Sequence, residues 1–153
     1  MKLYRLGKAP YISDTSGKGG LYYGGRWHTV GRQILYTAEH LSLAKLEVLA
    51  NSPVLPRHYF ALTLEIPDDT PFLEYGPADL PANWQQVPYT AELAELGRAW
   101  LEAGTHWVLR VPSAHAPAEW NYLLNPLHPD HSRHLRVLSV EPHPFDERLK
   151  QSK

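Results

Sequence analysis

Fourteen prolines, roughly twice the usual share of ~5%, limit the length of any helix or strand in this 153-residue chain. Proline lacks a backbone N–H and fixes φ, so it interrupts helices and central strands. Pro53, Pro67 and Pro112 each follow an apolar stretch, and we expect each to end one helix or strand. The sequence therefore predicts short elements joined by rigid loops.

Apolar spacing between the prolines predicts several strands. Alternation over residues 59–66 directs Leu62, Leu64 and Ile66 toward a core from one side of a strand. Further strands are expected over four segments: 21–28, 33–37, 107–111 and 133–141. The remaining segments 67–89 and 113–132 are rich in turn residues and are expected to be long connections.

Two helices are also expected. The first covers 43–50, with Ser42 as its N-cap, and the second covers 91–103 and ends at Gly104. On the first helix, Glu47 projects toward the apolar side, which is an unusual position for a carboxylate. A site built around this side chain is one explanation.

The irregular order of strands and helices predicts an α+β fold rather than alternating βαβ units. No internal repeat or low-complexity stretch divides the chain. We therefore expect a single domain over residues 1–145, followed by a charged C-terminal tail over 146–153.

The charge balance argues against several functions. Fifteen lysines and arginines stand against sixteen aspartates and glutamates, a formal net charge of −1. Nonspecific nucleic-acid binding and attraction to an anionic membrane both need a surplus of basic residues. Neither direct nucleic-acid binding nor membrane binding is expected.

The absence of cysteine excludes disulfides, thiolate nucleophiles and cysteine-based metal sites. Any nucleophile or ligand must therefore be an oxygen or an imidazole nitrogen. No stretch approaches the ~20 apolar residues of a membrane span, and the N-terminus does not resemble a signal peptide. We expect a cytoplasmic protein.

Two motifs are weak. The glycines over 17–25 do not have the spacing of either standard phosphate-binding loop, so a mobile loop is favoured. His128, His131 and His134 recur every third residue, but Pro129 restricts a helix that could bring them together. No metal site is expected, and metal-dependent hydrolysis is a distant alternative.

Four polar residues stand out because each belongs to a different expected element. Arg26 and Tyr36 lie in two strands, Glu47 lies on a helix, and Ser113 follows a strand end. Each has an ordinary explanation: Arg26 could pair with Glu47, Tyr36 could be core, and Ser113 could cap a turn. Together they outline a polar cluster, which is how a site is built on a scaffold.

The segments around these residues resemble the RES-domain family. The resemblance is carried, in order, by Gly24–His28, Leu35–Glu39, Ser42–Glu47, Val111–Ser113 and Asn121–Pro126. It implies an ADP-ribosyltransferase-like fold, a mixed split β-sheet with flanking short helices. It also implies the toxin of a type II toxin–antitoxin system, which cleaves NAD at the nicotinamide–ribose bond and depletes the cell of NAD.

The resemblance also implies site residues and partners. Arg26, Glu47 and Ser113 match the three residues that name the family, and Tyr36 matches its active-site tyrosine. Asn121 and Asn125 fit an asparagine motif and are expected to bind NAD. NAD is then a substrate, with no prosthetic group, and the protein partner is an Xre-type helix-turn-helix antitoxin, in a complex in which the toxin is expected to be a homo-oligomer.

The residue types suit this chemistry. Nicotinamide leaves as a neutral molecule, so no general acid is needed, and one carboxylate can stabilise the positive charge at ribose C1′. We assign that role to Glu47. Arg26 would grip the pyrophosphate, Tyr36 would stack on nicotinamide or ribose, and Ser113 would hydrogen-bond the ribose or the carboxamide.

Two alternatives remain at this point. The same residues could transfer ADP-ribose to a specific protein, which differs only in the acceptor. The aromatic loops and the polar cluster could instead form a noncatalytic binding domain, which would release no nicotinamide.

Overall fold

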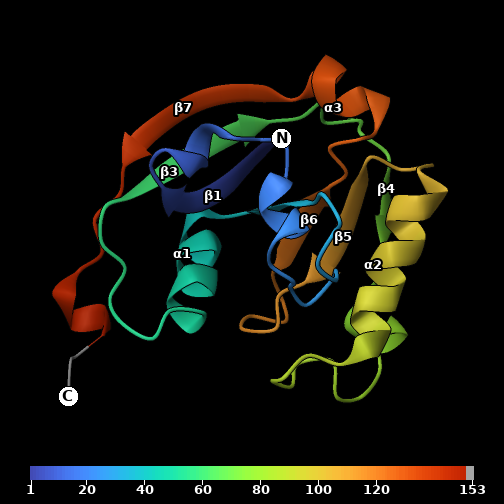
Figure 1. Ribbon diagram of the computed structural model, residues 1–153, viewed down its shortest axis with the longest axis horizontal. Helices are drawn as coiled ribbons and strands as arrows, with labels where there is room; N and C mark the ends of the chain where they lie inside the picture. Colours follow the sequence, from blue (N-terminus) through green and yellow to red (C-terminus); the bar gives the residue numbers. More distant parts are fainter. Residues whose placement is uncertain (151–153) are drawn as a thin grey trace.

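A computed structural model describes residues 1–150 (Figure 1). The strands are β1 Lys2–Lys8, β2 Leu35–Ala38, β3 Tyr59–Glu65, β4 Phe72–Glu74, β5 Val108–Pro112, β6 Trp120–Leu124 and β7 Arg136–Pro142. The helices are α1 Leu41–Ala50, α2 Ala91–Ala103 and α3 Pro129–His134. None of the helices within residues 1–150 is long and apolar enough to cross a membrane.

All seven strands form one mixed sheet in the order β4-β5-β6-β2-β1-β3-β7. Only β4 and β5 run parallel, and the other neighbours are antiparallel. β1 and β2 pair at a single position, Tyr4 opposite Ala38. The sheet therefore splits there into a β4-β5-β6-β2 part and a β1-β3-β7 part.

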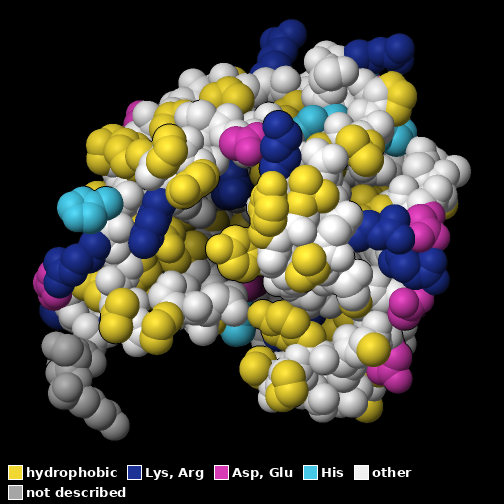
Figure 2. All heavy atoms as spheres, in the orientation of Figure 1, with side chains coloured by type: hydrophobic (Ala, Val, Ile, Leu, Met, Phe, Trp, Pro, Cys, Tyr) yellow, Lys and Arg dark blue, Asp and Glu magenta, His cyan; other side chains and the backbone are white. Residues whose placement is uncertain are grey.

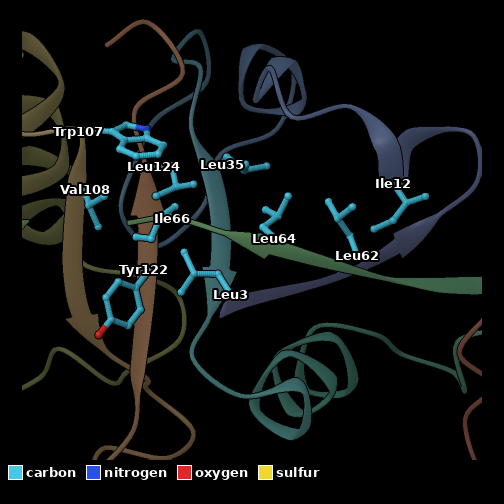
Figure 3. Packing of buried hydrophobic residues seen from close by; sticks show 10 residues of the cluster. All are labelled: Leu3, Ile12, Leu35, Leu62, Leu64, Ile66, Trp107, Val108, Tyr122 and Leu124. Carbon is cyan, nitrogen blue, oxygen red and sulfur yellow. The ribbon is translucent and has the colours of Figure 1, made fainter. Parts of the chain in front are cut away.

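The two faces of the sheet are covered differently. On one face, a single apolar cluster that includes Leu3, Leu35, Leu64 and Leu124 joins both parts of the sheet (Figure 3). On the other face there are two separate clusters. One packs α2 on β5 and β6, and the other packs α1 on β1 and β3 (Figure 1). The split sheet thus has one continuous core on one face and two separate helix-covered cores on the other.

Several expectations are confirmed. The expected strand over 59–66 is β3, and Leu62, Leu64 and Ile66 are buried. The helix expected over 91–103 is α2, and Gly104 ends it with a left-handed backbone at φ 61°. The fold is α+β, as the irregular element order indicates.

Other expectations are wrong. Residues 21–28 do not form a strand, because their backbone hydrogen bonds are local turn bonds. The β-structure in this segment is an isolated bridge between Gly25 and His28. The expected connection over 113–132 contains β6, and the one over 67–89 contains β4. The first helix begins earlier than expected, so that Ser42 lies inside α1 and His40 takes the N-cap position.

The C-terminal tail is described in part. Residues Glu147–Leu149 form one 3-10 turn, and the Asp146 side chain accepts a hydrogen bond from the Arg148 backbone N–H. Residues 151–153, the end of the tail expected over 146–153, lie outside the described residues.

His131 is bonded through both ring nitrogens. Its Nδ1 accepts the indole N–H of Trp107 at 3.0 Å, and its Nε2 donates to the Thr15 carbonyl oxygen at 2.7 Å. This arrangement holds α3 to the N-terminal segment and leaves no lone pair on His131 for a metal ion. Within residues 1–150, no group of three or more histidine or acidic side chains is placed to hold a metal ion.

Acid should destabilise this arrangement. Burial lowers the pKa of His131 below its ordinary value of 6.5, because desolvation disfavours the charged ring. The neutral ring is also the form whose Nδ1 accepts the Trp107 N–H. The stabilisation is full above the unfolded-state pKa and is lost as pH falls through the lower folded-state pKa. We expect the free energy of unfolding, measured in urea, to decrease between pH 7.5 and pH 5.

His131→Gln provides the comparison for this prediction. The variant should be about 1–3 kcal/mol less stable at pH 7.5, because buried hydrogen bonds are lost. It should also lose less stability on acidification, since glutamine does not titrate. A pH dependence equal to that of the parent chain would contradict the assignment to His131.

Candidate active site

A cleft opens where β1 and β2 diverge. Its volume is about 520 Å³, and both strands line it together with α1, the loop before β2 and the segment after β5. Figure 2 shows the surface hollowed between the part that carries α1 and the part that carries α2. The lining side chains that bear polar groups include Arg5, Arg26, Tyr36, Glu47, Asn51, Tyr89, His115 and Asn121. The split in the sheet therefore brings distant segments of the chain to one cavity.

Glu47 is held firmly in this cleft by two donors. Its Oε1 accepts a hydrogen bond from Ser113 Oγ at 2.7 Å and another from Asn121 Nδ2 at 2.8 Å. Its Oε2 lies 3.6 Å from His115 Nε2, and the side chain is 27% exposed. One carboxylate oxygen is thus fixed by the protein, and the other remains for a ligand.

Ser113 contacts Glu47 and caps the turn that follows β5. The residue is fully buried, and its hydroxyl proton is given to Glu47. Its oxygen accepts the backbone N–H groups of His115 and Ala116 at 3.1 and 3.3 Å. Ser113 is not among the residues that line the cleft, and its contact with the site is through Glu47.

The two asparagines of the sequence motif lie in different places. Asn121 lies on β6, opposite Val111 and Ala38, and its amide reaches Glu47. Asn125 follows the end of β6 and is buried away from the residues that line the cleft. Its Oδ1 accepts the Leu127 backbone N–H, as in a turn. The structure brings Asn121 to the site and leaves Asn125 with a local role.

Arg26 does not pair with Glu47. Its Nη1 donates to the backbone carbonyl oxygens of Trp84 and Gln86 at 2.7 and 3.1 Å, and its guanidinium lies over the Tyr89 ring at 4.6 Å. Within residues 1–150, the Nε and Nη2 groups make no hydrogen bond, so two parallel N–H donors remain on one edge of the guanidinium. That edge has the fork geometry that suits a phosphate or carboxylate.

Tyr36 lies on β2 and lines the cleft. Its hydroxyl oxygen accepts the Trp27 backbone N–H at 3.3 Å and lies 2.7 Å from His28 Nδ1. Burial raises the pKa of the Tyr36 hydroxyl well above its ordinary value of 10, so the side chain stays neutral. The ring offers an apolar surface beside the cleft.

The order and geometry of these residues agree with one family. The RES domain family matches residues 2–146, nearly the whole chain. The chain belongs to the RES domain family. A relative from Photorhabdus laumondii named Toxin Res is 36% identical to this RES domain over 158 residues, covering 100% of this chain and 99% of the relative. A Toxin Res from Yersinia enterocolitica is 36% identical over 155 residues, covering 98% and 100%.

Two further comparisons bear on the RES domain. A protein from Sphingobium named Prs ADP-ribosylating toxin is 34% identical over 140 residues, covering 89% of this chain and 86% of the relative. A chain in the crystal structure of the M. tuberculosis MbcT–MbcA toxin–antitoxin complex has the same fold, with a TM-score of 0.74 and 16% identity. That match covers 94% of this chain and 84% of the other. The expected ADP-ribosyltransferase-like α+β fold with a split sheet is confirmed.

Some residues of the RES domain site escape sequence reasoning. His28, Tyr89 and His115 contact the four expected residues, and none of the three was expected from the sequence to be a site residue. Tyr89 also donates its hydroxyl to Asn51 Oδ1 at 3.3 Å, which links the loop before α2 to the end of α1. Proline, glycine and acidic residues in the expected connection 67–89 indicate a loop, and its packing over Arg26 depends on tertiary contacts.

Proposed function

We propose that this RES domain is the toxin of a toxin–antitoxin system and cleaves NAD at the bond between nicotinamide and ribose. The observation that carries the proposal is the carboxylate of Glu47, fixed by Ser113 and Asn121 at the wall of a cleft that also presents Arg26. The cleft volume of about 520 Å³ lies within the ~300–1,000 Å³ of small-molecule sites. The names of the relatives, Toxin Res and Prs ADP-ribosylating toxin, support the same class of activity.

The chemistry follows from the charges. The bond between ribose C1′ and the nicotinamide nitrogen breaks, and its electron pair leaves with nicotinamide, which becomes neutral. Positive charge then develops at C1′, where the free Oε2 of Glu47 stabilises it. Because Oε1 is already held by two donors, the carboxylate needs little reorganisation as the charge forms.

Arg26 and the two tyrosines would hold the rest of the dinucleotide. The unused Nε and Nη2 edge of Arg26 suits the pyrophosphate. The rings of Tyr36 and Tyr89, which both line the cleft, would contact nicotinamide, ribose or adenine. The proposal treats NAD as a substrate and requires no prosthetic group.

The acceptor of ADP-ribose defines the finer activity. Water would give an NAD glycohydrolase, and inorganic phosphate an NAD phosphorylase. Transfer to a specific protein is a second candidate, because the Sphingobium relative is named an ADP-ribosylating toxin. In each case an acceptor atom bonds to C1′ as nicotinamide leaves, and Glu47 Oε2 would orient the acceptor.

A toxin of this kind needs an inhibitor. The M. tuberculosis neighbour is part of a toxin–antitoxin complex, and we extend this to an Xre-type antitoxin for this chain. A partner that carries a helix-turn-helix would contact DNA itself, which fits the net charge of −1 of the toxin. The toxin is proposed to act in the cytoplasm on the NAD pool, and to be a homo-oligomer within the complex.

Identification of the products tests the acceptor. The purified chain is incubated with biotinylated NAD, with and without phosphate and with a cell extract. Free ADP-ribose supports hydrolysis, ADP-ribose phosphate supports phosphorolysis, and a labelled protein supports transfer. The absence of all three products from folded protein would overturn the proposal in favour of a binding domain.

Ser113→Ala tests the support of Glu47. Removing one donor from Oε1 should lower kcat for NAD cleavage roughly 10- to 100-fold, the cost of one hydrogen bond to a charged group. KM should change little, because Ser113 does not reach the cleft. Ser139→Ala on β7, measured by nicotinamide release in the same way, should keep the parental rate. A large KM effect with unchanged kcat would argue for direct substrate contact by Ser113.

A further inference from the structure

His28 is buried beside the cleft although histidine is polar. It is 5% exposed, and its ring lies between the Tyr23 carbonyl and the Tyr36 hydroxyl. Nε2 is 2.8 Å from Tyr23 O, and Nδ1 is 2.7 Å from Tyr36 Oη. Both ring nitrogens are thus used, and one of them contacts a residue of the proposed site.

The contacts fix where the protons lie. A carbonyl oxygen can only accept, so His28 Nε2 must carry a hydrogen and donate it to Tyr23. In the neutral ring, Nδ1 is then an acceptor, and Tyr36 must donate its hydroxyl proton to it. Burial lowers the pKa of His28, which favours this neutral form. The Trp27 backbone N–H approaches the same tyrosine oxygen as a donor.

The surrounding backbone makes room for this arrangement. A Cβ at Gly25 would lie 2.8 Å from Tyr36 Oη and 3.1 Å from His28 Cε1. A Cβ at Gly20 would lie 3.2 Å from His28 Nε2 and 2.1 Å from the Arg32 carbonyl oxygen. Any other residue at these two positions would push the imidazole or the tyrosine aside.

We propose that His28 is a positioning residue that binds the hydroxyl proton of Tyr36 and so presents this tyrosine to a ligand as a hydrogen-bond acceptor. A ligand that reaches the Tyr36 hydroxyl would meet an oxygen lone pair and no proton. Tyr36 therefore selects for a hydroxyl or amide N–H on the ligand at this place. It does not act as a general acid, which agrees with a leaving group that departs neutral.

This inference rests on the proposed NAD cleavage only for its kinetic consequences. Two matched variants test the roles of the two ring nitrogens separately. His28→Asn keeps an acceptor oxygen near the position of Nδ1, whereas His28→Gln places its amide near the position of Nε2. We expect Tyr36→Phe and His28→Gln each to lower kcat/KM for NAD about tenfold, the loss of one hydrogen bond. His28→Asn should stay within about threefold of the parent chain.

A double-variant comparison distinguishes positioning from mere structural support. If His28 acts through Tyr36, adding His28→Gln to the Tyr36→Phe chain should change kcat/KM less than twofold, because the interaction is already absent. If His28 only supports the fold, the reductions in kcat/KM caused by His28→Gln and by Tyr36→Phe should multiply in the double variant. His131→Gln replaces another doubly bonded buried histidine outside the cleft and should leave kcat/KM unchanged in folded protein.

The proton positions can be measured without NAD. Nitrogen-15 NMR of the wild-type chain should show His28 as the neutral form with hydrogen on Nε2, and Tyr36→Phe should shift the Nδ1 signal toward that of a free acceptor. Hydrogen on Nδ1, or no response to Tyr36→Phe, would overturn the inference, as would equal losses in His28→Asn and His28→Gln. A correct NMR signature in a chain that releases no nicotinamide would leave this inference standing and overturn the proposed function.

Discussion

Glu47→Gln is expected to reduce the rate of NAD cleavage by a factor of about 10³ or more while leaving NAD affinity within a few-fold of the parent. Glutamine has nearly the same shape, and its oxygen can still accept from Ser113 and Asn121 at the position of Oε1. Only the negative charge is lost. Because this charge matters most when C1′ becomes positive, the change affects the transition state rather than binding.

Two measurements check this prediction. Nicotinamide release gives kcat, and calorimetry with the inactive variant gives the Kd for NAD. Glu39→Gln is a matched control, because Glu39 is a similarly shielded glutamate whose Oε1 accepts the Trp120 backbone N–H outside the cleft. That variant should keep kcat within about twofold, because the glutamine oxygen can still accept the Trp120 N–H and Glu39 is not among the residues that line the cleft. A Glu47→Gln chain with weak NAD binding and normal kcat would show that Glu47 binds NAD rather than stabilising the transition state.

Gly97→Ala is expected to destabilise the chain strongly. In a helix, alanine is normally favoured over glycine by up to ~1 kcal/mol. At Gly97 of α2, however, an added Cβ would lie 1.8 Å from the Trp27 carbonyl oxygen. Either α2 or the segment around Trp27 must move, and we expect a loss of about 3 kcal/mol or more, as in severe overpacking.

Gly97→Ala should also disturb the cleft. Trp27 donates its backbone N–H to Tyr36 and directly follows Arg26, so a displaced Trp27 disturbs both side chains. Thermal unfolding should show a decrease in Tm of roughly 10 °C, and kcat/KM should fall at temperatures where the chain is still folded. Gly19→Ala is the control, because a Cβ at Gly19 meets nothing within 4 Å. An unchanged Tm in Gly97→Ala would show that the close approach of α2 to Trp27 is not required.

Apolar periodicity in the sequence correctly predicted the elements that bury a single face. β3 alternates because Leu62 and Leu64 pack on one cluster, and α2 carries an apolar stripe against β5 and β6. β1 has no such pattern, because Leu3 packs on the cluster that joins both parts of the sheet and Leu6 on the cluster below α1. A strand covered on both faces does not alternate, and spacing alone cannot reveal it.

The candidate site was predictable as a set of residues but not as a network. Glu47 on an apolar helix side gave a physical signal, and the family resemblance supplied Arg26, Tyr36 and Ser113. The bonds among them depend on the split between β1 and β2, which places the end of β5 beside α1. The burial of Ser113 is a consequence of that packing, so its contact with Glu47 could not be seen in the sequence.

Nicotinamide release from NAD by the purified, antitoxin-free chain tests the central claim most directly. We predict release that increases in proportion to protein and time, and that disappears in Glu47→Gln protein with the same melting temperature. If the folded chain releases no nicotinamide, or if Glu47→Gln releases it at the parental rate, the cleft around Glu47 is not the site of NAD cleavage.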